Sequence, residues 1–76
     1  MTPDIIQNLI EAGLPGARAR VTGDDGVHFE ATVVCEAFRG KMPLARHRLV
    51  YATLGDRMGG EIHALALRTL TPEEEK

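Results

Sequence analysis

Three histidines and a single cysteine are the side chains of this sequence best suited to metal binding or nucleophilic chemistry. His63 follows the pair Gly59-Gly60 and opens an apolar run, so its imidazole could reach solvent near the start of a strand. A neutral imidazole in that position could bind iron, zinc or copper. The alternative is a histidine at a strand end whose ring hydrogen-bonds to a neighbouring carbonyl. The residues alone leave both interpretations open.

The other histidines and the cysteine each have a plainer interpretation. His28 follows a Gly-Asp-Asp-Gly turn and could be an exposed strand residue without a specific role. His47 falls on the apolar stripe of an expected helix, which favours a half-buried ring that bonds to a backbone carbonyl. Cys35 alternates in phase with Phe29, which favours a small, buried apolar side chain. No nucleophilic triad, P-loop, dinucleotide-binding or zinc-protease motif is readable, so we do not expect an enzyme.

Length, charge and composition indicate a small single domain. The 76 residues suit one domain, 1–76, with a modest core and a charged tail over about 73–76 that is expected to fray. The formal net charge of -2 argues against a general attraction to nucleic acid or membrane. The sequence has no apolar run of about 18 residues and no secretory signal, and a lone cysteine suits a reducing compartment. We therefore expect a cytoplasmic protein.

Hydrophobic spacing and breaker residues divide the chain into helices and strands. Thr2 suits an N-cap, Pro3 suits the first helical position, and Gly13 can stop the first helix. Alternation with a period of two on both sides of the turn at 23–26 predicts a β-hairpin. The expected elements, in order, are a helix over 3–13, strands over 17–21 and 27–35, a loop over 38–41, a helix over 43–54, a helical turn over 56–58 and a strand over 62–70.

The order of these elements, α-β-β-α-(α)-β, indicates an α+β fold. The hairpin strands run antiparallel, whereas the second and third strands are joined through helices, which permits a parallel crossover. The expected architecture is a three-stranded mixed sheet with helices on one face. The second helix should turn one face toward that sheet, and this face is formed by Leu44, His47, Val50, Tyr51 and Leu54.

Two stretches of the sequence resemble the BolA family: FRGKMPLARHRLVYATL over 38–54 and EIHALALRTLTPEE over 61–74. The family carries a Phe-x-Gly-Lys loop, an Arg-His-Arg-Leu-Val-Tyr helix and an Ile-His-Ala-Leu strand that ends in Thr-Pro-x-Glu. In this chain the motifs fall at Phe38, Gly40 and Lys41, at 46–51, at 62–65, and at Thr71, Pro72 and Glu74. The resemblance implies a class II KH-like αββααβ fold, in agreement with the order above. One departure is Cys35, where the family more often has Ser.

The resemblance also implies a function in iron–sulfur chemistry. In BolA proteins the histidine that matches His63 is a cluster ligand in complexes with monothiol glutaredoxins, and a second ligand, His or Cys, lies in the hairpin region. His28 is the metal-competent side chain of that region, so the implied site is His63 and His28, sharing a 2Fe-2S cluster with a glutaredoxin cysteine and glutathione. Asp24 and Asp25 are hard oxygen donors and are interpreted as turn residues. Both imidazoles would have to lie exposed on one surface of a protein that we expect to be monomeric when free.

Two other functions stay open. BolA proteins are also described as transcriptional regulators, and a KH-like fold with a basic patch of Arg39, Lys41, Arg46 and Arg48 could contact nucleic acid. Against this, the loop Gly55–Gly60 lacks the Gly-x-x-Gly spacing with which KH domains hold a nucleic-acid backbone, and aromatic residues are few. The remaining possibility is a stable adaptor whose contact with glutaredoxin carries no metal.

Overall fold

A capped helix and a β-hairpin form the first half of the chain. In the computed structural model, which describes residues 1–75, α1 spans Pro3–Gly13. The hydroxyl of Thr2 accepts a hydrogen bond from the Ile5 N–H at 3.3 Å, as an N-cap should, and the helix ends where expected. β1 (Arg18–Thr22) pairs antiparallel with β2 (His28–Val34), which confirms the hairpin.

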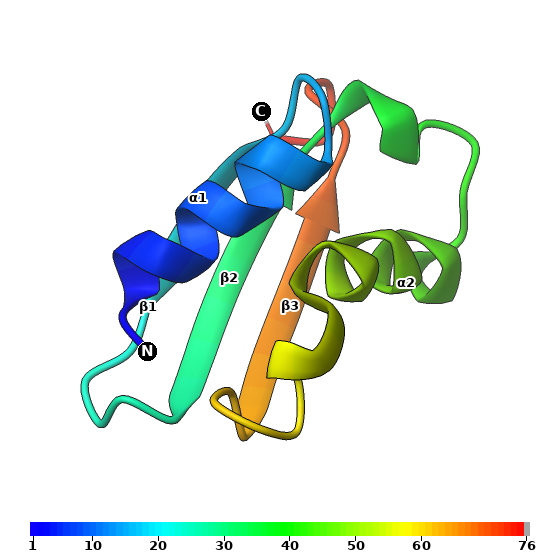
Figure 1. The fold of residues 1–76 in the computed structure, drawn as a ribbon. Helices are drawn as coiled ribbons and strands as arrows, with labels where there is room; N and C mark the ends of the chain where they lie inside the picture. The colour runs from blue at the N-terminus through cyan, green and yellow to red at the C-terminus, as the bar shows by residue number, and fades with distance from the viewer. Residues whose placement is uncertain (76) are drawn as a thin grey trace.

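The second half crosses over the sheet and returns as a parallel strand. A short 3₁₀ helix, η1 (Glu36–Phe38), leads to α2 (Pro43–Leu54), and a second one, η2 (Gly55–Arg57), follows it. β3 (Ala64–Leu70) then pairs parallel with β2, so the strand order is β1-β2-β3. Figure 1 shows α1 and α2 on the same side of this sheet. The predicted three-stranded mixed sheet and α+β class are confirmed.

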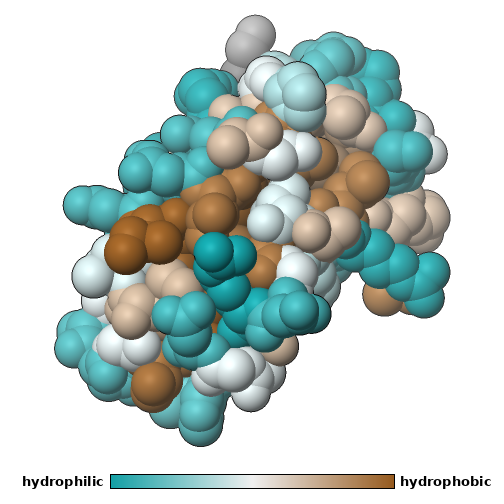
Figure 2. All heavy atoms as spheres, viewed as in Figure 1, coloured by the Kyte–Doolittle hydropathy of each residue, from teal (hydrophilic) through white to brown (hydrophobic). Residues whose placement is uncertain are grey.

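The core lies between the helices and the inner face of the sheet. The inward side chains of β2 alternate, with Phe29, Ala31 and Val33 all buried. The α-helices contribute fully buried aliphatic residues, and the connecting segments add Phe38 of η1 and Ile62, both at 0% exposure. On the helical side, much of the apolar surface gathers in a band across the molecule, with hydrophilic residues on both sides of it (Figure 2). The opposite face of the sheet carries no helix in the described part of the chain.

Two local predictions differ from the structure. Leu44, expected on the buried face of the second helix, is 62% exposed, while Leu49 packs against the core instead. The first turn of α2 lies beyond the outer edge of β3 (Figure 1), so no sheet lies beneath it. The final strand begins at Ala64 rather than at Ile62, because Ile62 donates its N–H to the Arg57 carbonyl at 2.9 Å in a tight turn.

The C-terminal segment after β3 folds back onto the domain through ion pairs. Three consecutive glutamates each pair with an arginine: Glu73 with Arg39 at 2.5 Å, Glu74 with Arg46 at 2.7 Å and Glu75 with Arg18 at 2.6 Å. The last residue of the predicted tail, Lys76, lies outside the described residues. None of the helices within residues 1–75 has the length and apolar character needed to cross a lipid bilayer.

Candidate functional site

The parallel pairing of β2 with β3 brings His28 and His63 together. His28 begins β2, and its partner in the register is Ala64, the residue that follows His63. The backbone N–H of His63 donates to the Val27 carbonyl at 3.0 Å, which ties it to the start of β2. The two imidazole centroids lie 6.2 Å apart, with their ring planes at 74°. Two rings that are distant in the sequence therefore meet at one end of the sheet.

Both rings are open to solvent. The His28 side chain is 63% exposed, and His63 is also exposed. The geometric condition that the sequence sets for a shared ligand pair, two exposed imidazoles on one surface, is met. The described residues contain no group of three or more His, Cys, Asp or Glu side chains able to hold a metal ion. The donor set that this part of the chain offers is therefore two imidazoles.

Asp25 holds the turn and contacts the His28 ring. Its Oδ1 accepts the backbone N–H groups of Val27 at 3.0 Å and of His28 at 2.8 Å, and its Oδ2 lies 2.6 Å from His28 Nδ1. The backbone N–H of His28, then that of Val27, and then the His28 imidazole hold the pKa of Asp25 far below its usual range. Asp25 is therefore a carboxylate at neutral pH. Its turn role is as predicted, but the contact with the ring was missed, although the i, i+3 spacing across a tight turn is a signal for it.

Cys35 and His47 keep structural positions. Cys35 is 1% exposed, and its Sγ lies 3.8 Å from the Pro15 carbonyl, so the predicted buried, apolar role is confirmed. His47 is half-buried on α2. Neither residue joins the pair of exposed imidazoles.

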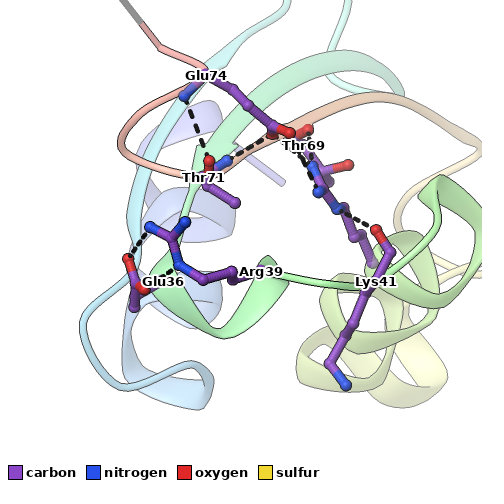
Figure 3. A network of polar contacts seen from close by, with 7 residues as sticks. Glu36, Arg39, Lys41, Thr69, Thr71 and Glu74 are labelled. Atoms are coloured by element: carbon purple, nitrogen blue, oxygen red, sulfur yellow. Dashed lines mark hydrogen bonds and ion pairs between the residues drawn. The ribbon is translucent and has the colours of Figure 1, made fainter.

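Two members of the predicted basic patch are already engaged inside the domain. Arg39 contacts Glu36 (Figure 3) and Glu73, each at 2.5 Å. Both carboxylates raise the pKa of its guanidinium. Arg46, which the patch would need at the surface, has a side chain that is only 11% exposed. Of the four residues of the patch, Lys41 and Arg48 are exposed and form no ion pair within residues 1–75.

Arg46 is the centre of a network that joins three segments. It donates to the carbonyls of Lys41 at 2.8 Å and Thr69 at 3.1 Å, and its guanidinium lies 5.9 Å from the centre of the Phe38 ring. It also makes two bonds to the Glu74 carboxylate, at 2.7 and 3.3 Å. The arginine, followed by the Thr71 N–H, lowers the pKa of Glu74 to about 2. The loop before α2, the end of β3 and the C-terminal turn are thus held by one side chain.

A comparison with protein-family models decides the family. The model described as BolA-like protein matches residues 12–74. The chain belongs to the BolA family.

A solved BolA structure has the same fold as this chain, and curated BolA relatives match much of its sequence. A structure of a bolA protein homologue from Coxiella burnetii superimposes with a TM-score of 0.90, is 49% identical, and covers 99% of this chain and 96% of that one. Human BolA-like protein 1 is 38% identical over 74 residues, 97% of this chain and 51% of the relative. A Vibrio cholerae protein named DNA-binding transcriptional regulator BolA is 55% identical over 47 residues, 62% of this chain and 44% of the relative. The chain spans about half the length of these curated relatives.

The BolA motifs of this chain include structural as well as candidate functional residues. In the Thr-Pro-x-Glu motif, the Thr71 N–H donates to the Glu74 carboxylate at 2.9 Å, and the Glu74 N–H donates back to the Thr71 hydroxyl at 3.3 Å (Figure 3). This reciprocal pair presents the carboxylate to Arg46 of the helix motif. Among the motif residues, His63 is the one with an exposed metal-competent side chain.

A basic row on the open face of the BolA sheet was not predicted from the sequence. The strand registers align Arg20, Thr32 and Arg68 in one row. They line a shallow hollow of about 330 Å³ together with Thr22, Glu30 and Ala66. Neither arginine forms an ion pair in the portion of the chain that the structure describes. Strict alternation along the strands would have placed both on this outer face.

Proposed function

We propose that this chain is a partner protein of a monothiol glutaredoxin and that His28 and His63 supply two ligands of a 2Fe-2S cluster shared between them. The observation that carries the proposal is the pair of exposed imidazoles whose centroids lie 6.2 Å apart. The expected role is in iron–sulfur cluster trafficking or in sensing iron and redox state, rather than in catalysis.

The ligand count explains why a partner is needed. A 2Fe-2S cluster takes four protein-type ligands, and histidine pairs replace cysteine pairs in some of these centres. The described residues offer two imidazoles, and the one cysteine is buried. The remaining ligands would be thiolates, one from a glutaredoxin cysteine and one from glutathione. Neutral imidazoles in place of thiolates also raise the reduction potential of such a centre.

The backbone around the pair supports a preformed half-site. Val27 uses one carbonyl to accept the N–H groups of His63 at 3.0 Å and Ala64 at 3.3 Å. The relative position of the two histidines is therefore fixed by main-chain bonds and by the parallel register, and not by long side chains. A half-site whose backbone is fixed before the partner arrives loses less conformational entropy on binding.

Reconstitution of the cluster in a complex with a monothiol glutaredoxin and glutathione tests the proposal. We expect His63→Ala and His28→Ala each to change the visible absorption and circular dichroism of the cluster and to shorten its lifetime. His47→Gln, which alters the half-buried histidine, is the matched control and should leave the spectrum unchanged. An unaltered spectrum and lifetime in His63→Ala would reject the site. A complex that forms but stays colourless in the unmodified protein would favour an adaptor without metal.

A second candidate is DNA binding, favoured by the name of the Vibrio cholerae relative and by the unpaired arginines of the open face. Backbone binding should weaken steeply between about 50 and 200 mM salt. Two double variants, Arg20→Ala with Arg68→Ala and Lys41→Ala with Arg48→Ala, would show which surface is used. Absence of binding to duplex DNA at the lower salt concentration would count against this function.

A further inference from the structure

We propose that Asp25 is a positioning residue that presets His28 for metal binding by fixing which ring nitrogen carries the proton. The inference rests on the proposed function in naming the metal ligand, but it makes a separate statement about the metal-free protein. In the metal-free protein, the neutral His28 ring carries its proton on Nδ1. Its Nε2 then has a free lone pair that points away from Asp25.

Backbone hydrogen bonds fix the orientation of the Asp25 carboxylate independently of the His28 ring. Its Oδ1 accepts two backbone N–H groups, from Val27 and from His28, so the carboxylate cannot rotate without losing the hydrogen bonds that hold the loop. The second oxygen, Oδ2, then lies 2.6 Å from His28 Nδ1. An ionised carboxylate only accepts hydrogen bonds, so Nδ1 has to donate. In a neutral imidazole the other nitrogen is then the one able to bind a metal ion.

The same arrangement is how proteins orient histidine ligands in general. A ligating imidazole commonly donates its second N–H to a carboxylate, which fixes the tautomer and makes the ligand more basic. Here the carboxylate belongs to the turn immediately before the ligand, so the turn and the ligand are set by one side chain. His63 has no such carboxylate among the contacts of residues 1–75, and its hydrogen bond to Val27 fixes its backbone but not its ring.

The two histidines of the pair are therefore unequal. Asp25 fixes the ring orientation and the proton position of His28, whereas the exposed His63 ring makes no hydrogen bond within residues 1–75. We infer that His28 is the preset ligand and that His63 adjusts when the site is completed. The chain also provides its own control, because Asp24 carries the same charge one residue earlier and makes no hydrogen bond to the His28 ring.

The decisive substitution is Asp25→Asn. An asparagine Oδ1 can still accept both backbone N–H groups and keep the turn, but its NH₂ group would face Nδ1 as a donor. The proton should then move to Nε2, the nitrogen that a metal ion needs. Asp24→Asn changes the net charge equally and should leave the tautomer as it is. Asp25→Ser, whose hydroxyl can hold the turn without a carboxylate, is a second variant in case the asparagine disturbs the loop.

The first measurement is made on the metal-free protein. Nitrogen-15 NMR of the imidazole rings at about pH 8.5, well above the ordinary histidine pKa of about 6.5, reports the tautomer directly. We expect an Nδ1–H ring for His28 in the unmodified protein and in Asp24→Asn, and an Nε2–H ring in Asp25→Asn. A His28 tautomer that is the same in Asp25→Asn and in the unmodified protein, with the backbone spectrum intact, overturns the proposal.

The second measurement is the lifetime of the reconstituted cluster. Loss of such an orienting group commonly costs about 10–100-fold in metal affinity, so Asp25→Asn should shorten the lifetime by about 10-fold or more relative to Asp24→Asn. If His28→Ala shortens the lifetime and Asp25→Asn does not, the positioning role is overturned while the proposed function stands. If His28→Ala has no effect, the ligand assignment fails, and the NMR result still decides whether Asp25 sets the tautomer.

Discussion

Replacing Arg46 by alanine tests whether this arginine holds the domain together or serves as a surface group for a partner. The change removes donors from two backbone carbonyls, those of Lys41 and Thr69, and leaves the Glu74 carboxylate without its arginine. It also removes the stacking of the guanidinium on Phe38 and the packing of a side chain that is 89% covered, since 11% is exposed.

The size of the effect follows from these contacts. Hydrogen bonds that involve a charged group contribute about 1.5–3 kcal/mol when partly buried, and a cation–π contact contributes about 0.5–1 kcal/mol at an exposed site. Because water will reach the freed carbonyls, we expect a net loss of roughly 2–3 kcal/mol in the free energy of unfolding. For a domain of this size, each kcal/mol lowers the melting temperature by roughly 4–8 °C, so the expected shift is on the order of 10–20 °C.

Urea denaturation and thermal melts followed by circular dichroism measure the loss. Arg48→Ala is the matched control, because Arg48 lies on the same helix, is exposed and has no ion pair in the described chain. Its effect should stay within about 0.5 kcal/mol. Arg46→Lys keeps the charge but cannot form the same fork of bonds, so it should be intermediate. Equal stabilities of Arg46→Ala and Arg48→Ala would refute the structural role assigned to Arg46.

Three further predictions concern other contacts. The pKa of Glu74 is lowered to about 2 from its ordinary value of 4.5, so its stabilising effect is present above pH 4.5 and is lost as the pH falls toward 2. The difference in melting temperature between the unmodified protein and Glu74→Gln should therefore disappear over that range. Phe38→Ala removes a side chain with 0% exposure and should cost about 3–5 kcal/mol in urea denaturation. Gly23→Ala would place a Cβ 2.6 Å from Phe29 Cδ1 and 2.7 Å from the His28 carbonyl oxygen. It should therefore destabilise the domain by about 1–3 kcal/mol and shift the NMR signals of His28. Unshifted His28 signals would contradict this packing.

Local signals in the sequence predicted the elements well because the residues that carry them act on their nearest neighbours. Thr2 and Pro3 set the start of α1, and Gly55, at a φ of 54°, ends α2 where expected. The prediction that Leu44 is buried was wrong, because a periodic pattern does not reveal that the first turn of a helix extends past the sheet. Spacing tells which residues share a face, and only the packed structure tells where that face is covered.

The charged residues were predicted less well for a different reason. Arg46 and Arg48 look alike in the sequence, and the partner that distinguishes them, Glu74, lies in a segment that local patterns describe only as an acidic tail. The candidate ligand pair could be reached from the family resemblance, but their convergence depends on the parallel register of β2 and β3. The Asp25 contact lies within one turn and could have been found from the sequence.

The parallel arrangement of β2 and β3 decides when, during synthesis of the chain, the two exposed imidazoles first lie side by side. During translation His28 emerges early, whereas the strand that brings His63 beside it is made near the end of this domain. A nascent chain on the ribosome therefore exposes single imidazoles but not the pair. The pairing of the two rings is thus a property of the finished domain, because only a domain that has docked its last strand presents both imidazoles on one surface.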